Sequence, residues 1–512
     1  MKLSTALAVL IAIQRHGHRM MCLLASADDH ERKLRINQDD AAKRVNDAVE
    51  LAKASVDAGD VHGVALPLNY VHLSTGQQQL TVALRLPGVD RDQHVMVDTG
   101  SSSLSFCNKS LIEEAANITK KDYAQCGTFG VIFSCQNDRS LTGHLLFIVG
   151  QVFQGKIAAY NTKTGEEIAS MHDVNFAIIE GAQNYACFGP LDGLIGVAYT
   201  ARNKVVETPS PEFDAFSLWD PVCETNNPLY PSLGNCITGN MTNTALPSPL
   251  EQSLQGGVDS GYNSVKAFGL YCDYAATNRS EKDTIIPSLG AYFGGDVALN
   301  NTFYNSGTPQ VASVFSCKGV YDWYLLNLQS IRVPGMNNTK RTGFIQCNDH
   351  CNPNCFTDSG WSSIELPVDP ANCDFLSKTD TDTLEKMGSL YLDLEGVNGS
   401  TITLSLPLVW LKEQHALGFV GCTGTSTNWF VLGFPIYQFY YLVYDMGNNT
   451  ITFVDLPISN ETQAFMDGPE YGGVFEPSTS SEPSTGYRHT GSPSTNTFVM
   501  AGLLLLACNY IF

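Results

Sequence analysis

Two short acidic turns, far apart in the sequence, carry the residues that could do chemistry. The first is Asp98-Thr99-Gly100-Ser101-Ser102, which follows the apolar run Val95-Met96-Val97, and the second is Phe356-Thr357-Asp358-Ser359-Gly360. Each aspartate lies on a tight glycine turn after a β-prone segment. Two carboxylates about 3 Å apart cannot both ionise, so one stays charged and can take a proton from water while the other stays protonated and can polarise a carbonyl. We therefore predict that Asp98 and Asp358 form a hydrolytic dyad with a shared proton.

The composition sets limits on the fold and on the partners. A chain of 512 residues exceeds one ordinary domain and can bury a core that is divided between two lobes. Only 16% of the residues are charged, against roughly 25% in a typical soluble domain. The net charge is −21 and there is no basic block, which argues against nucleic acid and anionic membrane surfaces as partners.

Cysteine and asparagine usage indicates an oxidising compartment. Two of the 15 cysteines, Cys22 and Cys508, fall in expected processing segments and leave an odd number, so we expect one free thiol or one intermolecular bridge. Nine Asn-X-Ser/Thr acceptors predict a glycoprotein that passes through the secretory pathway. They are Asn108, Asn117, Asn240, Asn278, Asn300, Asn337, Asn398, Asn448 and Asn460.

The N-terminal segments are interpreted as targeting and processing signals. Residues 1–27 are typical of a signal peptide, with a cleavage site at Ala25-Ser26-Ala27. Residues 28–65 are a possible pro-segment, and the part up to residue 58 is charged and Ala-rich with helical character. Its Lys43 and Arg44 could pair with acidic groups in a substrate cleft, or the segment could be a solvated helical leader.

The C-terminus is typical of a lipid-anchored surface protein. Residues 458–486 are predicted to be a Ser/Thr/Pro-rich stalk. Residues 487–512 match a GPI-attachment signal, with small residues at Ser484-Thr485-Gly486, a polar spacer and the apolar tail from Phe498. A plain tail anchor and the absence of an anchor remain alternatives.

Between these ends the chain is expected to be all-β. Runs of four to eight β-branched and aromatic residues alternate with Gly, Asn, Asp and Pro, for example Leu80–Leu86 before a Pro-Gly turn. Helical segments are few and short, such as Ser110–Ala116. Each half of the chain contains a strand, an acidic glycine turn and a later apolar-Gly segment, so we expect an N-terminal lobe over 66–275 and a C-terminal lobe over 276–457.

From about Leu80 to Leu456 the chain resembles the pepsin-like aspartic endopeptidases. Two segments match the family's catalytic turns, and four others, in the family's order, are similar to its structural motifs. The six are Asp98–Ser102, Leu191–Tyr199, Phe293–Asp296, Trp323–Leu328, Asp358–Gly360 and Trp429–Gly433 with Tyr440–Asp445. The resemblance implies a bilobal double β-barrel with a central cleft between the lobes.

The resemblance also implies roles for individual residues. Asp98 and Asp358 would hold a water that attacks a peptide carbonyl, one acid acting as base and the other as acid, with no covalent enzyme intermediate. Ser101 would donate a hydrogen bond to the outer oxygen of Asp98. Gly100 and Gly360 would let backbone N–H groups approach the carboxylates. Cys373 and Cys422 are spaced like a second-lobe disulfide of the membrane-anchored members.

Three positions depart from the family's pattern. Trp361 stands where a Thr or Ser would steady Asp358, with Ser362 or Ser363 as possible substitutes. If Ser140–Gly143 aligns with the turn of the mobile hairpin, Cys135 or Gln136 takes the position of its Tyr. Phe434 replaces a frequent Asp. The first two departures predict slower turnover, because loss of a positioned donor costs on the order of tens to hundreds-fold in rate.

Two other motifs have competing interpretations. Asp259-Ser260-Gly261 also contains an Asp-Ser-Gly sequence, but no apolar strand precedes it, so we interpret it as a surface turn. The cysteines at 347, 351 and 355 could suggest a zinc knuckle. Their spacing and the oxidising compartment favour a disulfide-pinned insertion instead.

The sequence therefore predicts an aspartic endopeptidase that acts on peptides or proteins without a metal or other cofactor. It is expected to be a monomer at the cell surface, held by a GPI anchor, or else secreted, vacuolar or lysosomal. The alternative hypothesis is a pepsin-fold surface protein with weak or no catalysis that binds peptides or proteins.

Overall fold

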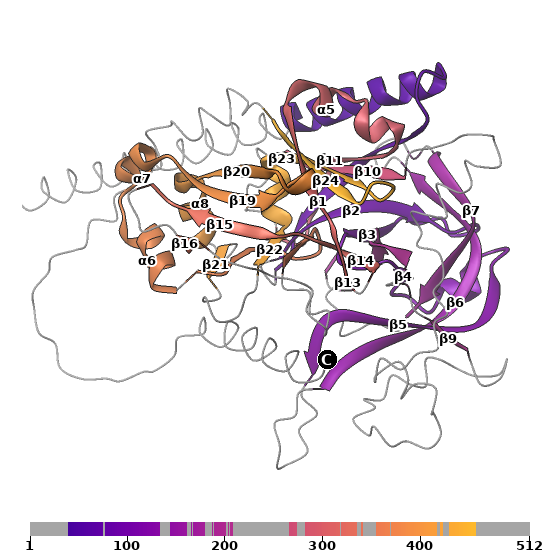
Figure 1. The fold of residues 1–512 in the computed structure, drawn as a ribbon. Coiled ribbons are helices and arrows are strands. Elements are labelled where there is room, and N and C mark those ends of the chain that lie inside the picture. Colours follow the sequence, from indigo (N-terminus) through magenta and orange to yellow (C-terminus); the bar gives the residue numbers. More distant parts are fainter. Residues whose placement is uncertain are drawn as a thin grey trace, which may run out of the picture.

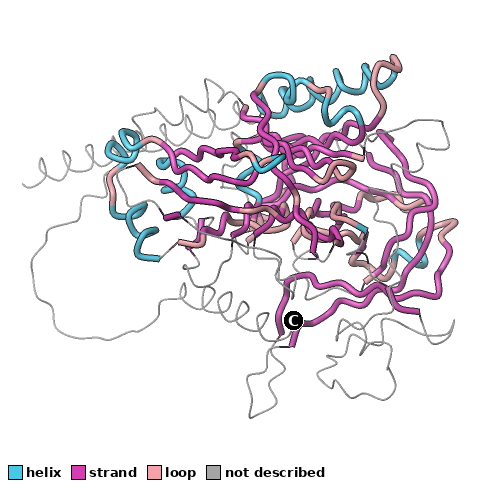
Figure 2. Tube along the Cα trace, in the orientation of Figure 1, coloured by secondary structure: helices cyan, strands magenta, loops and turns pink. Residues whose placement is uncertain are grey.

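The fold is built mostly from β-strands, as Figure 2 shows, with fewer and shorter helical segments. The structure is a computed structural model. It describes residues 39–74, 77–133, 144–160, 165, 167–179, 187, 189–200, 203, 205–207, 266–273, 282–317, 319–334, 339–340, 355–368, 370–416, 420–422 and 430–456. The expected all-β class is confirmed, and within these ranges no helix is long and apolar enough to cross a membrane.

One large sheet joins the two halves of the chain. Its centre is the antiparallel pair of β1 (Gly63–His72) and β11 (Ile285–Gly295), in register from Gly63 opposite Gly295. The described strands follow the order β12-β24-β23-β10-β11-β1-β2-β3-β8-β4-β7-β6-β5-β9 (Figure 1). The other strands on the C-terminal side are β10 (Ala267–Cys272), β12 (Thr308–Ser313), β23 (Tyr440–Asp445) and β24 (Thr450–Asp455). Those on the N-terminal side are β2 (Gln78–Arg85), β3 (Gln93–Asp98), β4 (Leu104–Phe106), β5 (Thr119–Phe133), β6 (His144–Tyr160), β7 (Glu167–Ile178), β8 (Gly193–Gly196) and β9 (Val205–Glu207).

Two smaller sheets complete the second half. The first has the order β13-β14-β17-β22-β18-β21 and the second the order β16-β15-β19-β20. Their strands are β13 (Phe315–Cys317), β14 (Val320–Leu325), β15 (Leu328–Arg332), β16 (Thr339–Lys340), β17 (Cys355–Asp358), β18 (Ile364–Leu366), β19 (Ser389–Glu395), β20 (Thr401–Pro407), β21 (Val420–Cys422) and β22 (Phe430–Gly433). The helices here are α6 (Pro370–Lys378), α7 (Thr381–Met387) and α8 (Leu408–Ala416), with the short 3₁₀ turns η7 (Val397–Gly399) and η8 (Phe434–Gln438).

Aromatic side chains fill the core between the two halves. The ring of Phe268 stacks on Tyr444, with centroids 4.7 Å apart, and on Tyr292 at 5.9 Å. Tyr324 packs against Tyr444 and donates its hydroxyl to the backbone oxygen of Val197 in the first half, at 2.6 Å. The ring of Tyr324 also packs against Tyr199 of the first half, with centroids 5.1 Å apart, so this buried aromatic packing helps to fix how the halves meet.

A helix over residues 39–57 covers one face of the large sheet. It lies beside α5 (Thr302–Ser306) in Figure 1, and it shares a buried cluster with Val297 and Ala298 of η6 (Asp296–Leu299). Its Val45, Val49 and neighbouring alanines pack in one cluster with Phe293 and Tyr441 of the sheet. The 3.6-residue period of an amphipathic helix explains why this face is buried and the opposite face is charged.

The two basic residues predicted to face a substrate cleft have other described partners. Lys43 bonds to Asp47 of the same helix at 2.7 Å, and Arg44 bonds to the buried Asp273 at 3.1 Å. The assignment of residues 28–65 as a possible pro-segment stays a prediction. The helix packs on the sheet and is not simply solvated. Lys43 and Arg44 contact Asp47 and Asp273, and neither of these acids belongs to the predicted dyad.

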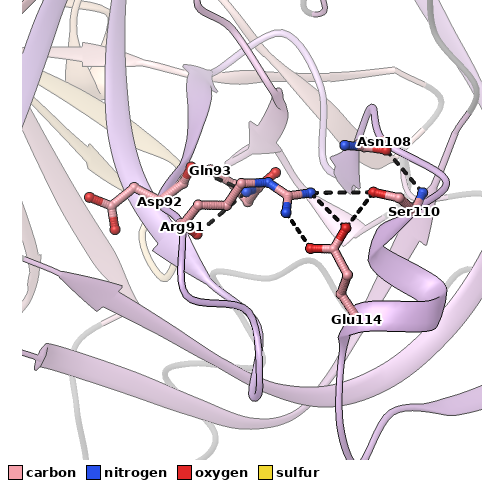
Figure 3. A network of polar contacts seen from close by, with 6 residues as sticks. All are labelled: Arg91, Asp92, Gln93, Asn108, Ser110 and Glu114. Carbon is pink, nitrogen blue, oxygen red and sulfur yellow. Dashed lines mark hydrogen bonds and ion pairs between the residues drawn. The ribbon is translucent and has the colours of Figure 1, made fainter.

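The first half carries a polar network and a disulfide near its outer strands. Figure 3 shows Arg91 bonded to Glu114 and Ser110, which ties the helix α2 (Leu111–Glu114) to the loop before β3. Asn108 accepts a hydrogen bond from the backbone of Ser110 at 2.9 Å in the same network. The disulfide joins Cys107 to Cys187. The sequence left this pairing open.

Candidate active site

The two predicted acids end two equivalent strands. Asp98 is the last residue of β3, which runs parallel to β8 with Asp98 opposite Gly196. Asp358 is the last residue of β17, which runs parallel to β22 with Asp358 opposite Gly433. A Cβ at Gly196 would lie 2.4 Å from the backbone of the first turn, and one at Gly433 would lie 2.1 Å from a carbonyl oxygen that follows the second. The glycine of each half's later apolar-Gly segment thus lies against that half's acidic turn.

A reciprocal set of buried hydrogen bonds joins the two turns. The backbone N–H of Thr99 donates to Ser359 Oγ at 2.9 Å, and the backbone N–H of Ser359 donates to Thr99 Oγ1 at the same distance. Each hydroxyl also donates to a strand carbonyl of the other half, Ser359 to Val97 at 2.7 Å and Thr99 to Thr357 at 3.3 Å. All four residues are buried, so the turns are held together without water.

This arrangement brings the two carboxyl groups into contact. The Asp98 side chain lies close enough to raise the pKa of Asp358 through its charge and through hydrogen bonding. A Cβ at Gly100 would lie 2.6 Å from Asp358 Oδ2, and a Cβ at Gly360 would lie 2.6 Å from Asp98 Oδ1. Each turn therefore needs glycine, because the other half's carboxyl group occupies the space of a side chain.

Backbone groups hold each carboxyl group to its own turn. The N–H of Gly100 donates to Asp98 Oδ1 at 2.7 Å, and the N–H of Gly360 donates to Asp358 Oδ1 at 2.8 Å. Ser101 Oγ donates to Asp98 Oδ2 at 2.6 Å. The hydrogen bonds expected for Ser101 and the two glycines are thus present.

The two acids differ in what surrounds them. Burial raises the pKa of Asp358 well above its usual value, and the negative charge of Asp98 and the hydrogen bond between them raise this pKa further. The backbone N–H groups of Gly360 and Trp361 act in the opposite direction on the same pKa. We therefore place the shared proton on Asp358 and the charge on Asp98, which keeps the Ser101 hydroxyl as a donor.

Trp361 changes the environment of the second acid. Ser363 does not replace the missing hydroxyl at Asp358, because its Oγ donates to Glu365 at 2.6 Å. Burial raises the pKa of Glu365, and hydrogen bonds from Ser363 and Trp361 partly offset that effect. Where the resemblance led us to expect polar residues, the structure has the half-buried indole of Trp361 and the buried ring of Phe434.

Several predicted features cannot be placed. The hairpin tip with Cys135 and Gln136, the Asp259 turn, and the segment with cysteines 347 and 351 lie outside the described residues. Cys422 is in a disulfide, and β21, where it lies, contacts α6. The side chain of Cys373 in α6 is outside the description, so the Cys373–Cys422 pairing stays a prediction.

Sequence reasoning missed two side chains that contact the turns from the opposite half. Gln79 Nε2 donates to the carbonyl oxygen of Gly360 at 2.9 Å, and Trp323 Nε1 donates to that of Gly100 at 2.8 Å. The strand around Gln79 gave no chemical signal. Trp323 belonged to a recognised motif, but its partner could not be identified from the sequence.

Comparison with known proteins identifies the fold. No family model and no curated protein matches the chain. Among solved structures, the aspartic proteinase from Irpex lacteus is similar with a TM-score of 0.50 and 13% sequence identity. The match covers 78% of this chain and 99% of that one. The pepsin-like fold expected from the motifs is therefore confirmed.

Proposed function

We propose that this protein is an aspartic endopeptidase with Asp98 and Asp358 as its catalytic pair. The observation that carries the proposal is the contact between these two acids across the two halves of the chain, with the pKa of Asp358 raised. The likeness to an aspartic proteinase supports the same reaction class. Peptides or proteins are the substrates, since the fold is that of a peptide-bond hydrolase.

The reaction uses the asymmetry of the pair. The ionised Asp98 takes a proton from a water molecule as the water oxygen bonds to the peptide carbonyl carbon. The protonated Asp358 donates its proton to the carbonyl oxygen, which gives a neutral gem-diol. Asp98 then donates the proton that it took from water to the amide nitrogen, while Asp358 takes a proton from one gem-diol hydroxyl; the C–N bond breaks as that carbonyl re-forms, and the pair again holds one shared proton.

Export and surface anchoring are part of the proposal and rest on the sequence. The five described Asn-X-Ser/Thr acceptors, Asn108, Asn117, Asn300, Asn398 and Asn448, are all exposed, as glycan attachment requires. The Cys107–Cys187 disulfide fits an oxidising compartment. The proposed GPI signal, residues 487–512, and the stalk before it lie outside the described residues.

The test is cleavage of a labelled peptide library by the purified protein between pH 3 and pH 7. We expect cleavage that a statine-type transition-state mimic inhibits and that Asp98→Asn and Asp358→Asn each abolish. Asp192→Asn is the matched control, because Asp192 is a half-buried acid of the same half that accepts a backbone N–H from His94, which an Asn oxygen can also accept.

Two results would reject the assignment. Unchanged cleavage by both dyad variants would show that other residues do the chemistry. Binding of peptides without fragments at any pH in this range would favour the alternative hypothesis of a binding protein.

A further inference from the structure

Gln79 is a buried amide that reaches the catalytic turn of the other half. It lies on β2 and its side chain is fully buried. The Gly360 carbonyl can only accept, so the amide nitrogen of Gln79 must face it, at 2.9 Å. The amide oxygen of Gln79 has no hydrogen-bond partner among the described residues. Burying half-satisfied amides is unfavourable, so this side chain costs stability that an apolar residue would not cost.

Trp323, in the second half of the chain, makes the corresponding contact with the catalytic turn of the first half. It lies on β14, and its ring stacks on Phe356 with centroids 5.9 Å apart and planes 19° apart. Its indole N–H donates to the Gly100 carbonyl at 2.8 Å. Phe356 precedes Asp358 by two residues, so this stack joins the strand of the second acid to the turn of the first.

Each contact fixes a peptide plane next to a carboxyl group. The carbonyl of Gly100 shares a planar peptide with the N–H of Ser101, whose hydroxyl donates to Asp98. The carbonyl of Gly360 shares one with the N–H of Trp361, which donates to the backbone oxygen of Asp358 at 3.1 Å. Rotation of either plane would move the donors that hold the acid in place.

We propose that Gln79 and Trp323 are positioning residues, each of which holds the catalytic turn of the opposite half and thereby aligns the two carboxyl groups. This inference rests on the proposed function for its kinetic consequence. It goes further, because it assigns the alignment of the dyad to two side chains that do not touch the reacting atoms. The pair acts in addition to the hydroxyl contacts between Thr99 and Ser359.

The experiment compares Gln79→Met and Trp323→Phe with two matched controls. Gln78→Met removes an equally buried amide from the next residue, which bonds across the two halves to Gln438 at 3.3 Å but not to a catalytic turn. Trp410→Phe removes a buried indole whose nitrogen has no hydrogen-bond partner among the described residues. The kinetic constants kcat and KM are measured for all four from pH 3 to pH 7.

We expect Gln79→Met and Trp323→Phe to lower kcat by about 10- to 100-fold with little change in KM, because a small misplacement of reacting groups has effects of that size. Their pH profiles should also narrow on the alkaline side, since carboxyl groups that lie farther apart share a proton less strongly. The controls should keep kcat within a few-fold of wild type. Equal kcat and equal pH profiles in all four variants would overturn the proposal.

A second measurement does not require turnover. The Tm of the wild type should change with pH through a transition that is absent in Asp358→Asn. The midpoint pH of this transition should be lower in Gln79→Met and Trp323→Phe than in wild type. It should be unchanged in Gln78→Met. An unchanged midpoint in all variants would overturn the positioning role. If the wild type cleaves nothing while these midpoints move as expected, the proposed function fails and the positioning role stands.

Discussion

Replacing Ser359 with alanine should damage the junction between the two turns. The Ser359 hydroxyl accepts the Thr99 N–H at 2.9 Å and donates to the Val97 carbonyl at 2.7 Å. Both partners belong to the first half of the chain, and all three residues are buried. Alanine would leave the Thr99 N–H without this acceptor and would remove a donor from the Val97 carbonyl.

The expected loss follows from these two contacts. A buried polar group left unsatisfied costs about 1–3 kcal/mol, so two such groups give a loss of about 2–6 kcal/mol in the free energy of unfolding. Activity should fall as well, because the Thr99 N–H helps to align the turn that carries Asp98. Ser359→Thr, which retains a hydroxyl, should recover most of the stability.

Urea denaturation at constant pH measures this loss as the change in midpoint multiplied by the m-value. Ser102→Ala is the matched control in the neighbouring turn. The Ser102 hydroxyl is equally buried, but it has no hydrogen-bond partner among the described residues, so its removal should cost little. If Ser359→Ala loses no more stability than Ser102→Ala, the reciprocal hydrogen bonds do not join the halves as we infer.

Two further predictions concern single contacts. Ser101→Ala should lower kcat by about 10- to 100-fold, because Asp98 loses a charge-assisted donor at 2.6 Å, and steady-state kinetics should show recovery in Ser101→Thr. Arg44→Met should lower the free energy of unfolding by about 1–3 kcal/mol, because Asp273 stays buried without its cation. Lys43→Met breaks an exposed ion pair within the helix and should change the free energy of unfolding, measured by urea denaturation, very little. Equal losses in the two variants would contradict the docking of this helix on the sheet.

The parts of the site that the sequence predicted are those with strict local requirements. An acid on a glycine turn after an apolar strand is visible in a few consecutive residues, and so are the glycines that support it. Asp98, Asp358 and the segment with Gly196 could therefore be identified. The alternation of apolar and polar residues similarly indicated the strands.

The parts that the sequence did not predict depend on long-range contacts. Gln79 and Gly360 are 281 positions apart, and Trp323 and Gly100 are 223 apart. Nothing in the residue types indicates that these groups meet. The helix over 39–57 shows the same limit, because its charged, Ala-rich composition indicated helical character but not the sheet face on which it packs or the ion pair with Asp273.

The pH dependence of unfolding in wild type and in Asp358→Asn tests the shared proton most directly. Because the pKa of Asp358 is raised from 3.8 in the folded state, its stabilising effect is complete below the unfolded value and is lost as the pH rises through the folded value. Acids outside the Asp98–Asp358 pair contribute equally to both proteins. The difference between the two curves of unfolding free energy against pH therefore reports the titration of this pair. We predict that wild type loses stability relative to Asp358→Asn as the pH rises above about 4, by up to about 1.4 kcal/mol per pH unit. Parallel curves from pH 3 to pH 7 would contradict the account, because they would show that Asp358 titrates as an isolated, solvated carboxyl group.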